Sequence, residues 1–346
     1  MRGNFGRNDW RATLLDHTST VEDAVRNLED SHLQIILVVS DDEFVGTITD
    51  GDIRRGFLQG LSLEDGLDGL IQTDPLVVPP DASQIAIMRL MEEHRVHGIP
   101  VIKANGQVAG LYVWSDLSGS VDRSNLMVIM AGGEGRRLRP LTDDCPKPLL
   151  LVAGRPILEH IIDQAVKAGF HRFVLSIGYL GHMIEEHFGN GDGFGVEIDY
   201  LREDKPLGTA GSLTLLDPIP NQPIIVTNGD VLTDIRYDEM LNYHGRYNAQ
   251  STIAVIRHEW RHQFGIVRTD GVEFLGIEEK PVDYSTINAG VYVLEPEVLK
   301  LLTAGERCDM TRLFQRLRER GDRTIVYPLY EPWVDIGRES DYLGMQ

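Results

Sequence analysis

The 346-residue sequence contains only two cysteines, Cys145 and Cys308, and it has no long apolar run. Two thiols are too few for a disulfide framework, and such scarcity is typical of a reducing cytoplasm. The N-terminal segment MRGNFGRNDWR lacks the apolar core of a signal peptide. No stretch approaches the ~20 apolar residues that cross a bilayer. These absences predict a cytoplasmic protein without a membrane partner.

Positive charge is also scarce, because 33 Lys and Arg residues face 53 Asp and Glu residues, for a formal net charge of -20. This balance argues against a nucleic acid or an anionic membrane as partner, since both attract extended basic surfaces. It leaves room for small phosphorylated ligands, which need only a local basic pocket. Such a pocket is indicated by AGGEGRRLRP at 131–140, where three glycines and three arginines follow the apolar run 126–130.

The first 120 residues contain an internal repeat. Shifted by 64 positions, QIILVVSDDEFVGTITDGD (34–52) aligns with GIPVIKANGQVAGLYVWSD (98–116). Each copy has the pattern of a helix followed by strand, turn and strand, with amphipathic segments at 21–28 and 85–91. Two half-cores of this size are expected to pack on each other. The pattern resembles a tandem CBS-domain pair, or Bateman module, so we predict this α+β module over 1–120.

The resemblance also suggests a ligand for this module. CBS pairs hold an adenine nucleotide between their halves, through a Gly-h-h-Thr/Ser-x-x-Asp motif that Gly46, Thr49 and Asp52 match here. Thr49 and Asp52 are therefore implied contacts of a regulatory nucleotide. In the second copy Asp116 is present but Val113 replaces the hydroxyl residue, so at most one good site is expected. The alternative is that Thr49 and Asp52 only cap the following helix, and that the module serves structure or assembly. CBS pairs often dock on one another, which favours a homo-oligomer.

The pattern of the chain changes after residue 120. SGSVDRSN at 118–125 is small and polar, which predicts a linker. Apolar strands then alternate with amphipathic helices, and we expect strands at 126–131, 172–177, 196–201, 223–228 and 251–256 and a helix from Pro156 to Gly169. This alternation predicts an α/β domain over 125–346 with a largely parallel, doubly wound sheet. Ligands of such sheets bind beyond the carboxyl ends of the strands, which is where the loop at 131–140 lies.

This loop fits neither of two common phosphate-binding patterns. The Walker A pattern is absent, and Gly133-Glu-Gly135 lacks the third glycine of a dinucleotide fingerprint. Residues 131–160 are instead similar to the sugar-1-phosphate nucleotidyltransferase signature, GGxGxRLxPLT…PKP. Further family motifs follow in order: PLGTAG (206–211), NGD (228–230), FG (264–265), EKP (279–281), NAGVY (288–292) and WVDIG (333–337). The resemblance implies a Rossmann-like, mixed-sheet nucleotidyltransferase domain over 125–346.

The resemblance implies transfer of a nucleoside monophosphate from an NTP to a sugar-1-phosphate, with release of pyrophosphate. Two polyanions must meet, so the protein has to neutralise charge and align an in-line attack, and no covalent nucleophile is needed. By their family positions Arg137 is expected on the triphosphate, Lys147 forms a second phosphate clamp, and Lys280 binds the sugar phosphate. Asp230 and Asp335 are the implied carboxylates for Mg²⁺, which prefers hard oxygen ligands.

The remaining family positions imply binding contacts. The nucleotide is expected on the glycine-rich loop and on PLGTAG, through Ala131, Gly132, Gly133, Gly135, Gly208 and Thr209. Gly265, Glu279 and Asn288 are the implied partners of the sugar hydroxyls. PLGTAG is more similar to the loop of guanylyltransferases than to that of thymidylyltransferases, which favours GTP.

A CBS pair ahead of a nucleotidyltransferase resembles a bacterial subgroup of guanylyltransferases, which includes glucosamine-1-phosphate guanylyltransferases of legionaminic acid biosynthesis. We therefore expect an Mg²⁺-dependent enzyme that makes a GDP-sugar. Glucosamine-1-phosphate is favoured over mannose- and heptose-1-phosphate, and another base or sugar is the alternative. A rival hypothesis is a non-catalytic nucleotide sensor that keeps the fold as a scaffold. Such a sensor could lose Arg137, Lys147, Asp230 or Lys280 without harm, and all four are present.

Overall fold

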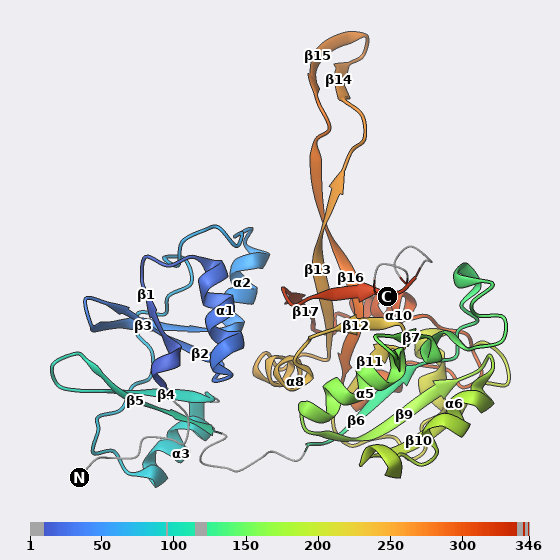
Figure 1. The fold of residues 1–346 in the computed structure, drawn as a ribbon, viewed down its shortest axis with the longest axis horizontal. Helices are drawn as coiled ribbons and strands as arrows, with labels where there is room; N and C mark the ends of the chain where they lie inside the picture. The colour runs from blue at the N-terminus through green and yellow to red at the C-terminus, as the bar shows by residue number, and fades with distance from the viewer. Residues whose placement is uncertain (1–9, 95, 115–122, 338–341, 343–344, 346) are drawn as a thin grey trace. The chain divides into compact units, whose positions relative to one another are not determined.

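The computed structural model describes residues 10–94, 96–114, 123–337, 342 and 345 (Figure 1). The chain forms two compact units, an N-terminal unit of Met1–Val121 and a C-terminal unit of Asp122–Gln346. Within the described ranges, no helix combines the length and the apolar character that a membrane span requires.

The two copies of the repeat form equivalent strand pairs in the N-terminal unit. In the first copy β2 (Ile35–Ser40) pairs antiparallel with β3 (Glu43–Thr49), and in the second β4 (Gly98–Ile102) pairs antiparallel with β5 (Val108–Val113). The other elements are η1 (Trp10–Thr13), β1 (Leu14–Asp16), α1 (Val21–Ser31), α2 (Asp50–Leu58) and α3 (Gln84–His94). Ile35 and Leu37 of β2 share one buried cluster with Leu111 and Val113 of β5. The predicted packing of the two half-cores is confirmed.

The C-terminal unit contains a seven-stranded sheet in the order β10-β9-β6-β11-β16-β13-β17. Its strands are β6 (Arg123–Met130), β9 (Phe170–Ile177), β10 (Glu197–Arg202), β11 (Ile224–Asn228), β13 (Ser251–Arg261), β16 (Val282–Leu294) and β17 (Thr324–Leu329). The first four strands in this order are parallel, as the alternating pattern predicts. Strand β16 runs antiparallel to both β11 and β13, so the sheet is mixed.

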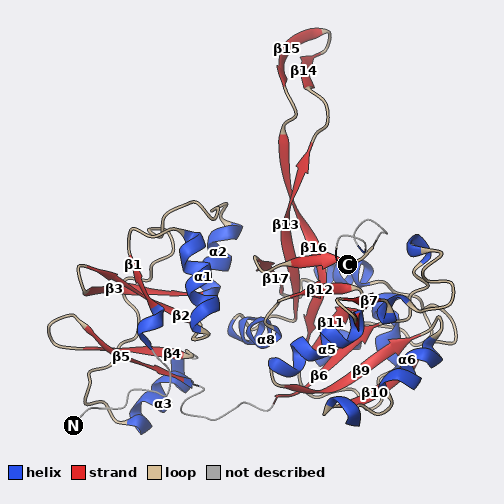
Figure 2. Cartoon of the chain, in the orientation of Figure 1, coloured by secondary structure: helices blue, strands red, loops and turns tan. Residues whose placement is uncertain are grey.

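Helices cover both faces of this sheet (Figure 2). Along β6, Met127 and Ile129 belong to one buried cluster, whereas Leu126 and Val128 belong to another. Because successive side chains of a strand point to opposite faces, these alternating memberships mean that both faces are covered. The helices are α5 (Ile157–Lys167), α6 (Gly181–Phe188), α7 (Gly208–Gly211), α8 (Tyr237–Arg246), α9 (Pro296–Leu299) and α10 (Met310–Arg320).

Short elements lie in the connections between these strands and helices. They are η2 (Arg136–Leu138), η3 (Lys147–Leu149), β7 (Leu151–Val152), β8 (Arg155–Pro156), η4 (Asp192–Phe194), η5 (Ser212–Leu215), β12 (Val231–Thr233) and β18 (Trp333–Asp335). The strands β12 and β18 pair antiparallel, which brings two distant parts of the chain together.

The predicted linker extends too far toward the C-terminus. Residues 118–122 lie outside the described part of the chain, as does Asp116, but Arg123–Asn125 belong to β6. The Asn125 amide donates a hydrogen bond to the Pro223 carbonyl (2.9 Å), and the Arg123 N–H donates to Gly169 (3.1 Å). The polar residues that suggested a linker therefore form the first part of β6. They can do so because they hydrogen-bond to neighbouring segments of the chain.

Two strands continue past the sheet as a long ribbon. The last pairing of β13 with β17 is at Ile256, and from Arg257 to Arg261 it pairs only with β16 among the described residues. The antiparallel strands β14 (Ile266–Asp270) and β15 (Glu273–Glu278) continue the ribbon. We call residues 257–287 the arm. Figure 1 shows it projecting from the sheet, with β14 and β15 at its far end.

Candidate active site

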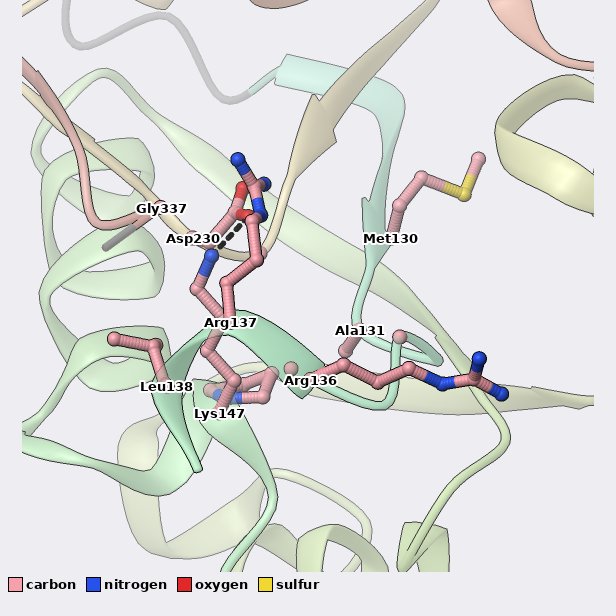
Figure 3. Close-up of a pocket in the computed structure, with 12 residues that line it drawn as sticks. Met130, Ala131, Arg136, Arg137, Leu138, Lys147, Asp230 and Gly337 are labelled. Atoms are coloured by element: carbon pink, nitrogen blue, oxygen red, sulfur yellow. Dashed lines mark hydrogen bonds and ion pairs between the residues drawn. The ribbon is translucent and has the colours of Figure 1, made fainter. Parts of the chain in front are cut away.

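A cavity of about 240 Å³ lies at the carboxyl ends of β6 and β11 (Figure 3). Its walls come from the glycine-rich loop after β6, from η3, and from the segments that follow β11 and β18. Parallel strands that end at one edge leave a crevice there, which is the usual ligand site of open α/β sheets. The predicted location of the site is therefore the location of the cavity.

The glycine-rich loop is closely packed at two of its glycines, Gly132 and Gly135. A Cβ added at Gly132 would lie 3.2 Å from the backbone nitrogen of Gly178, at the end of the neighbouring strand β9. Gly135 has a φ of +60°, and a Cβ there would lie 2.9 Å from the Thr142 side chain. Glycine is favoured at Gly135 because it adopts a positive φ without strain. The loop thus presents backbone to the cavity, where Ala131, Gly133 and Gly135 line the wall.

An ion pair crosses the cavity, with Lys147 nearly buried and Asp230 partly exposed. The Lys147 ammonium lies 2.5 Å from the Asp230 carboxylate. Lys147 comes from η3, where Pro146 and Pro148 flank it, and it is 8% exposed. Asp230 lies just beyond the carboxyl end of β11. A poorly hydrated ammonium of this kind requires an anionic partner, and the phosphate of a ligand could replace the carboxylate in that role.

The arginines of the loop differ in their directions. Figure 3 shows Arg137 pointing toward Asp230 on the same side as Lys147, whereas Arg136 points away from that pair. The Arg136 guanidinium instead contacts the Glu134 carboxylate at 2.6 Å. Arg139 lies 3.3 Å from Asp143. Of the three arginines, Arg137 is therefore the one directed at the ion pair.

Asp335 is brought to the same region by the β12–β18 pair. It lies opposite Val231 in the register, and the Ile336 N–H donates to the Asp230 carbonyl at 3.1 Å. A Cβ added at Gly337 would lie 3.4 Å from Arg137 Nη1 and 3.4 Å from Asp335 Oδ1. Two carboxylates separated by 105 positions in sequence are thus brought to the same region as Arg137.

The donor set suits a hard divalent cation that also binds phosphate. The described residues contain no cluster of three or more His, Cys, Asp and Glu side chains able to hold a metal. Mg²⁺ is commonly held by one or two carboxylates and completes its shell with water and substrate phosphates. Asp230 and Asp335 therefore fit such an ion, and they do not form a closed structural metal site.

Comparison with known proteins identifies the family of the C-terminal unit. The sequence model of the family described as nucleotidyl transferase matches residues 126–346, which is well over half of the chain. The chain belongs to the nucleotidyl transferase family. In the N-terminal unit, the CBS domain model matches residues 12–58 and 67–122.

Similar proteins share the nucleotidyl transferase region. Mannose-1-phosphate guanylyltransferase of Mycobacterium tuberculosis is 35% identical over 224 residues, and the mannose-1-phosphate guanylyltransferase catalytic subunit beta of Danio rerio is 33% identical over 224 residues. Each match covers 62% of this chain and 62% of the relative, so the chain spans less than two thirds of their length.

Solved structures show the same fold. A putative glucose-1-phosphate thymidylyltransferase from Bacillus anthracis aligns with a TM-score of 0.53, and HddC from Yersinia pseudotuberculosis aligns with a TM-score of 0.52. Both are 23% identical to this chain and cover 64% of it, and the match covers 94% and 97% of their own chains. At this identity the likeness concerns the fold alone, and it agrees with the mixed sheet of the nucleotidyl transferase unit.

The PLGTAG segment of the nucleotidyl transferase unit is held by another part of the chain. The Thr209 hydroxyl accepts a hydrogen bond from the Met310 N–H at 2.9 Å. Gly208 has a φ of +79°, and an added Cβ would lie 2.7 Å from the Cys308 carbonyl oxygen. Neither Gly208 nor Thr209 lines the cavity. In this structure both residues secure the loop against the segment before α10.

Three of the four sugar-side residues implied by the resemblance lie on the arm. Gly265 precedes β14, while Glu279 and Lys280 follow β15 and are exposed. A Cβ at Gly265 would lie 2.8 Å from Glu279 Oε2, so these two are neighbours. None of the three lines the cavity around Lys147 and Asp230.

Asn288 lies on β16 outside the arm. Its amide donates to the Tyr292 hydroxyl at 2.7 Å, and its carbonyl oxygen accepts from the Gly290 N–H at 3.0 Å. Burial raises the pKa of Tyr292, the Asn288 hydrogen bond lowers it, and the negative charge of Asp230 raises it further. Asn288 is thus connected to the Asp230 side of the site through Tyr292.

Two residues that the sequence did not single out hold the phosphate loop. The Tyr179 hydroxyl donates to the carbonyls of Thr142 and Asp143 at 3.2 and 2.9 Å, and its N–H donates to Gly132 at 3.3 Å. Tyr179 therefore connects both ends of the loop. It follows β9 at the carboxyl edge of the sheet, which is the only sequence signal that could have identified it.

Glu203 is the second such residue, and it follows β10. Its carboxylate accepts from the Ser176 hydroxyl at 2.8 Å and from the Leu207 N–H at 2.8 Å. A Cβ added at Gly132 would lie 3.1 Å from its Oε1. Glu203 therefore joins PLGTAG to β9, and it places a carboxylate at the Gly132 end of the site.

In the N-terminal unit, Thr49 and Asp52 contact each other at the start of α2. Asp52 Oδ2 accepts from both the N–H (2.8 Å) and the hydroxyl (2.6 Å) of Thr49. Asp52 Oδ1 accepts from Arg55 and, at 3.2 Å, from the Gln72 amide. A carboxylate has about four acceptor positions, so Asp52, which is 5% exposed, is satisfied within the chain. These are the contacts expected of the capping alternative.

Proposed function

We propose that the nucleotidyl transferase unit transfers a nucleoside monophosphate from an NTP to a sugar-1-phosphate and releases pyrophosphate. The observation that carries the proposal is the Lys147–Asp230 pair beside Arg137, in a cavity walled by a glycine-rich loop. Cations and exposed backbone N–H groups together recognise polyphosphate. The mannose-1-phosphate guanylyltransferases among the relatives support a reaction of this class.

In the proposed reaction an oxygen of the sugar phosphate attacks the α-phosphorus of the NTP. The new bond joins that oxygen to the α-phosphorus, and the bond from the α-phosphorus to the bridging oxygen breaks. The electron pair leaves with pyrophosphate, and Arg137 is placed to stabilise its growing negative charge. Lys147 neutralises a phosphate that would otherwise repel the incoming anion. No side chain needs to form a covalent intermediate.

Mg²⁺ is the cofactor that we propose for this site. Asp230 and Asp335 would hold it, and the ion would supply charge neutralisation for the phosphate oxygens. Asp230 then has two tasks, because it is also the partner of Lys147 in the absence of ligand.

We infer that GTP is the preferred nucleotide. Glu203 presents a carboxylate near Gly132, where the base end of the nucleotide is expected. Guanine offers an N1–H and an N2 amino group side by side, and a carboxylate accepts from both, whereas adenine offers no such pair of donors. Because Glu203 also accepts from Ser176 and Leu207, Glu203→Gln is expected to lower kcat/KM for both nucleotides, and to lower it more for GTP than for ATP. An equal loss for both nucleotides would contradict the base assignment.

For the sugar we propose a hexose-1-phosphate. The relatives are named as mannose-1-phosphate guanylyltransferases, so we propose mannose-1-phosphate as the first candidate. Glucosamine-1-phosphate, which the resemblance to CBS-containing guanylyltransferases favours, is the second candidate. The residues implied in sugar recognition are Asn288 and those on the arm. These residues would discriminate between mannose-1-phosphate and glucosamine-1-phosphate.

Pyrophosphate release tests the proposal. It should be measured over the common NTPs and over mannose-, glucosamine- and heptose-1-phosphate, with Arg137→Ala and Lys280→Ala beside the unchanged protein. Arg137→Ala should mainly lower kcat, since its charge partner develops in the transition state. Lys280→Ala should mainly raise the KM for the sugar phosphate. Nucleotide binding without pyrophosphate release for any pair would favour the scaffold hypothesis instead.

A regulatory nucleotide in the N-terminal unit is a separate proposal. A ligand that used Asp52 would have to displace Arg55 or Gln72, because every acceptor position of the carboxylate is occupied. Calorimetric titration of AMP, ADP, ATP, GMP and GDP into the full chain and into Asp52→Ala decides between this proposal and the capping role. Equal stoichiometry in the two proteins would assign Asp52 to structure alone.

A further inference from the structure

Tyr342 joins two segments that lie far apart in the sequence. Its hydroxyl donates a hydrogen bond to the Leu151 carbonyl at 2.9 Å. Tyr342 and Met345 also pack against the buried cluster that contains Leu150. A tyrosine combines a large apolar contact with one hydrogen-bond donor, so it can fix both the position and the direction of a chain segment. Tyr342 is therefore held at the segment that contains Leu151.

Leu151 belongs to the part of the chain that forms one wall of the cavity. It begins β7, which follows closely on η3, the element that carries Lys147. Within this stretch the Leu150 N–H donates to the Lys147 carbonyl at 3.1 Å, and the Leu149 N–H donates to the Pro146 carbonyl at 2.8 Å. Because these bonds tie successive residues together, a displacement of Leu151 would also move the backbone that positions the Lys147 ammonium.

The chain that leads to Tyr342 forms a second wall of the cavity. Tyr342 follows Gly337 by five positions, and Gly337 lines the cavity together with Asp230 and Arg137 (Figure 3). Asp335, the second carboxylate proposed for the metal, lies two positions before Gly337. The contact of Tyr342 with Leu151 therefore connects the wall that contains Asp335 to the wall that contains Lys147.

These contacts form a closed ring at the cavity. Lys147 pairs with the Asp230 carboxylate, and the Asp230 carbonyl accepts from the Ile336 N–H. The chain then runs from Ile336 to Tyr342, which bonds to Leu151, four positions beyond Lys147. A ligand phosphate that took the place of Asp230 beside Lys147 would open the ring at the ion pair. The bond from Tyr342 would still join the two walls in that state.

We propose that Tyr342 is a positioning residue of the active site, which holds Asp335 and Gly337 in place relative to Lys147 while substrate is bound. Tyr342 is not among the residues that line the cavity, so it acts through the segments that it joins. Reacting groups must stay within about 0.5 Å of their productive geometry, and a small displacement by a distant change lowers the rate. The effect on catalysis rests on the proposed function, whereas the effect on the two walls does not.

Tyr342→Phe tests the hydrogen bond, because it removes the hydroxyl and keeps the ring. Tyr200→Phe is the matched control. The Tyr200 hydroxyl also donates to a backbone carbonyl, that of Gly189 at 2.6 Å, and Tyr200 packs against the same buried cluster without lining the cavity. Both variants should keep the circular dichroism spectrum of the unchanged protein.

Hydrogen exchange measured by mass spectrometry follows the two walls without any need for activity. In Tyr342→Phe, the peptides that span 147–151 and 333–337 should exchange ~2–10-fold faster, which is the factor that corresponds to the loss of one hydrogen bond. In Tyr200→Phe these two peptides should exchange as in the unchanged protein.

Pyrophosphate release gives the second readout. Tyr342→Phe should raise the Mg²⁺ concentration for half-maximal rate ~2–10-fold, because Asp335 is held less firmly, and it should leave the KM for the sugar phosphate unchanged. Tyr342→Ala, which also removes the ring, should raise that Mg²⁺ concentration further. The variant that keeps the ring should therefore retain part of the function.

Three outcomes would overturn the proposal. Equal hydrogen exchange in Tyr342→Phe and the unchanged protein would mean that the bond does not hold the walls. Equally fast exchange of the two peptides in Tyr200→Phe would mean a general loosening of the core. Faster exchange in Tyr342→Phe with an unchanged Mg²⁺ dependence would make Tyr342 an anchor of the chain alone. If the unchanged protein released no pyrophosphate, the proposed function would fail, and the exchange of the two peptides would still decide whether Tyr342 holds them.

Discussion

Replacing Asp230 by asparagine should separate two roles of one carboxylate. The change keeps the shape of the side chain and removes the negative charge that lies 2.5 Å from Lys147. Loss of a group that stabilises charge in the transition state costs about 3–4 kcal/mol in comparable sites. We therefore expect turnover with GTP, a hexose-1-phosphate and Mg²⁺ to fall by ~10²–10³-fold.

The same change should strengthen nucleotide binding when no metal is present. In the unchanged protein Asp230 repels any phosphate that approaches Lys147. At an effective dielectric constant of about 20–40, a unit charge about 5 Å from a phosphate contributes about 2–3 kcal/mol. The Asp230 side chain is 28% exposed, and water and salt screen it, which leaves about half of that energy. We expect metal-free GTP to bind the variant ~5–10-fold more tightly.

Isothermal titration with GTP in EDTA and steady-state pyrophosphate release at saturating Mg²⁺ measure the two effects separately. Asp234→Asn is the matched control, because it removes the same charge from an exposed residue that does not line the cavity. The control should match the unchanged protein in both assays. Near-normal turnover of Asp230→Asn, or weaker metal-free binding, would refute the assignment of this carboxylate.

Three further changes test other parts of the structure. Tyr179→Phe removes the hydroxyl that donates to the Thr142 carbonyl, and the loss of this hydrogen bond costs about 0.5–1.5 kcal/mol. The kcat/KM for the NTP should fall ~3–10-fold, and the KM for the sugar phosphate should not change. An equal change in both KM values would contradict a role confined to the phosphate loop. Burial lowers the pKa of His244, although Glu295 opposes the shift, so the unfolded state binds the proton first. Stability should therefore fall as the pH drops below about 6.5, and thermal midpoints of His244→Gln should depend less on pH over that range; parallel profiles would exclude His244 as the cause. Asp52→Ala should lower the stability of the N-terminal unit by about 1–3 kcal/mol in urea unfolding, and an unchanged midpoint would rule out the capping role.

The sheet and the position of the site could be predicted from local pattern. Strand β6 and helix α5 have the apolar spacing of buried elements, and Ile157, Leu158 and Ile161 are buried as the pattern requires. The carboxyl ends of parallel strands meet at one edge, so the glycine-rich loop and Asp230 had to lie near each other. The resemblance to a known family pointed to Lys147 and Arg137 without showing their directions.

Contacts between distant segments could not be predicted in the same way. Tyr179 and Glu203 belong to no motif in the sequence, and their roles come from bonds to Thr142 and Leu207 that only the folded chain reveals. The arm also lay beyond prediction. Its strands contain adjacent apolar residues, such as Ile266-Val267 and Phe274-Leu275. Such a pattern is compatible with a strand of a sheet and does not tell what lies beside it. The resemblance implied that Lys280 binds the sugar phosphate, and it did not show that this residue lies on the arm.

The strand β16 runs from the arm into the sheet, where Val291 lies opposite Thr227 of β11. Because one strand belongs to both, the insertions and deletions that the arm can accept during evolution are limited. Between Arg257 and the tip, the ribbon pairs only with itself in the described residues. Insertion of two residues in each strand would lengthen it by about 7 Å and keep every side chain on its own face. A single insertion in β16 would turn all side chains between that point and the sheet to the opposite face. Homologous chains should therefore differ in arm length by paired, even steps, while the segment from Asn288 onward keeps its length.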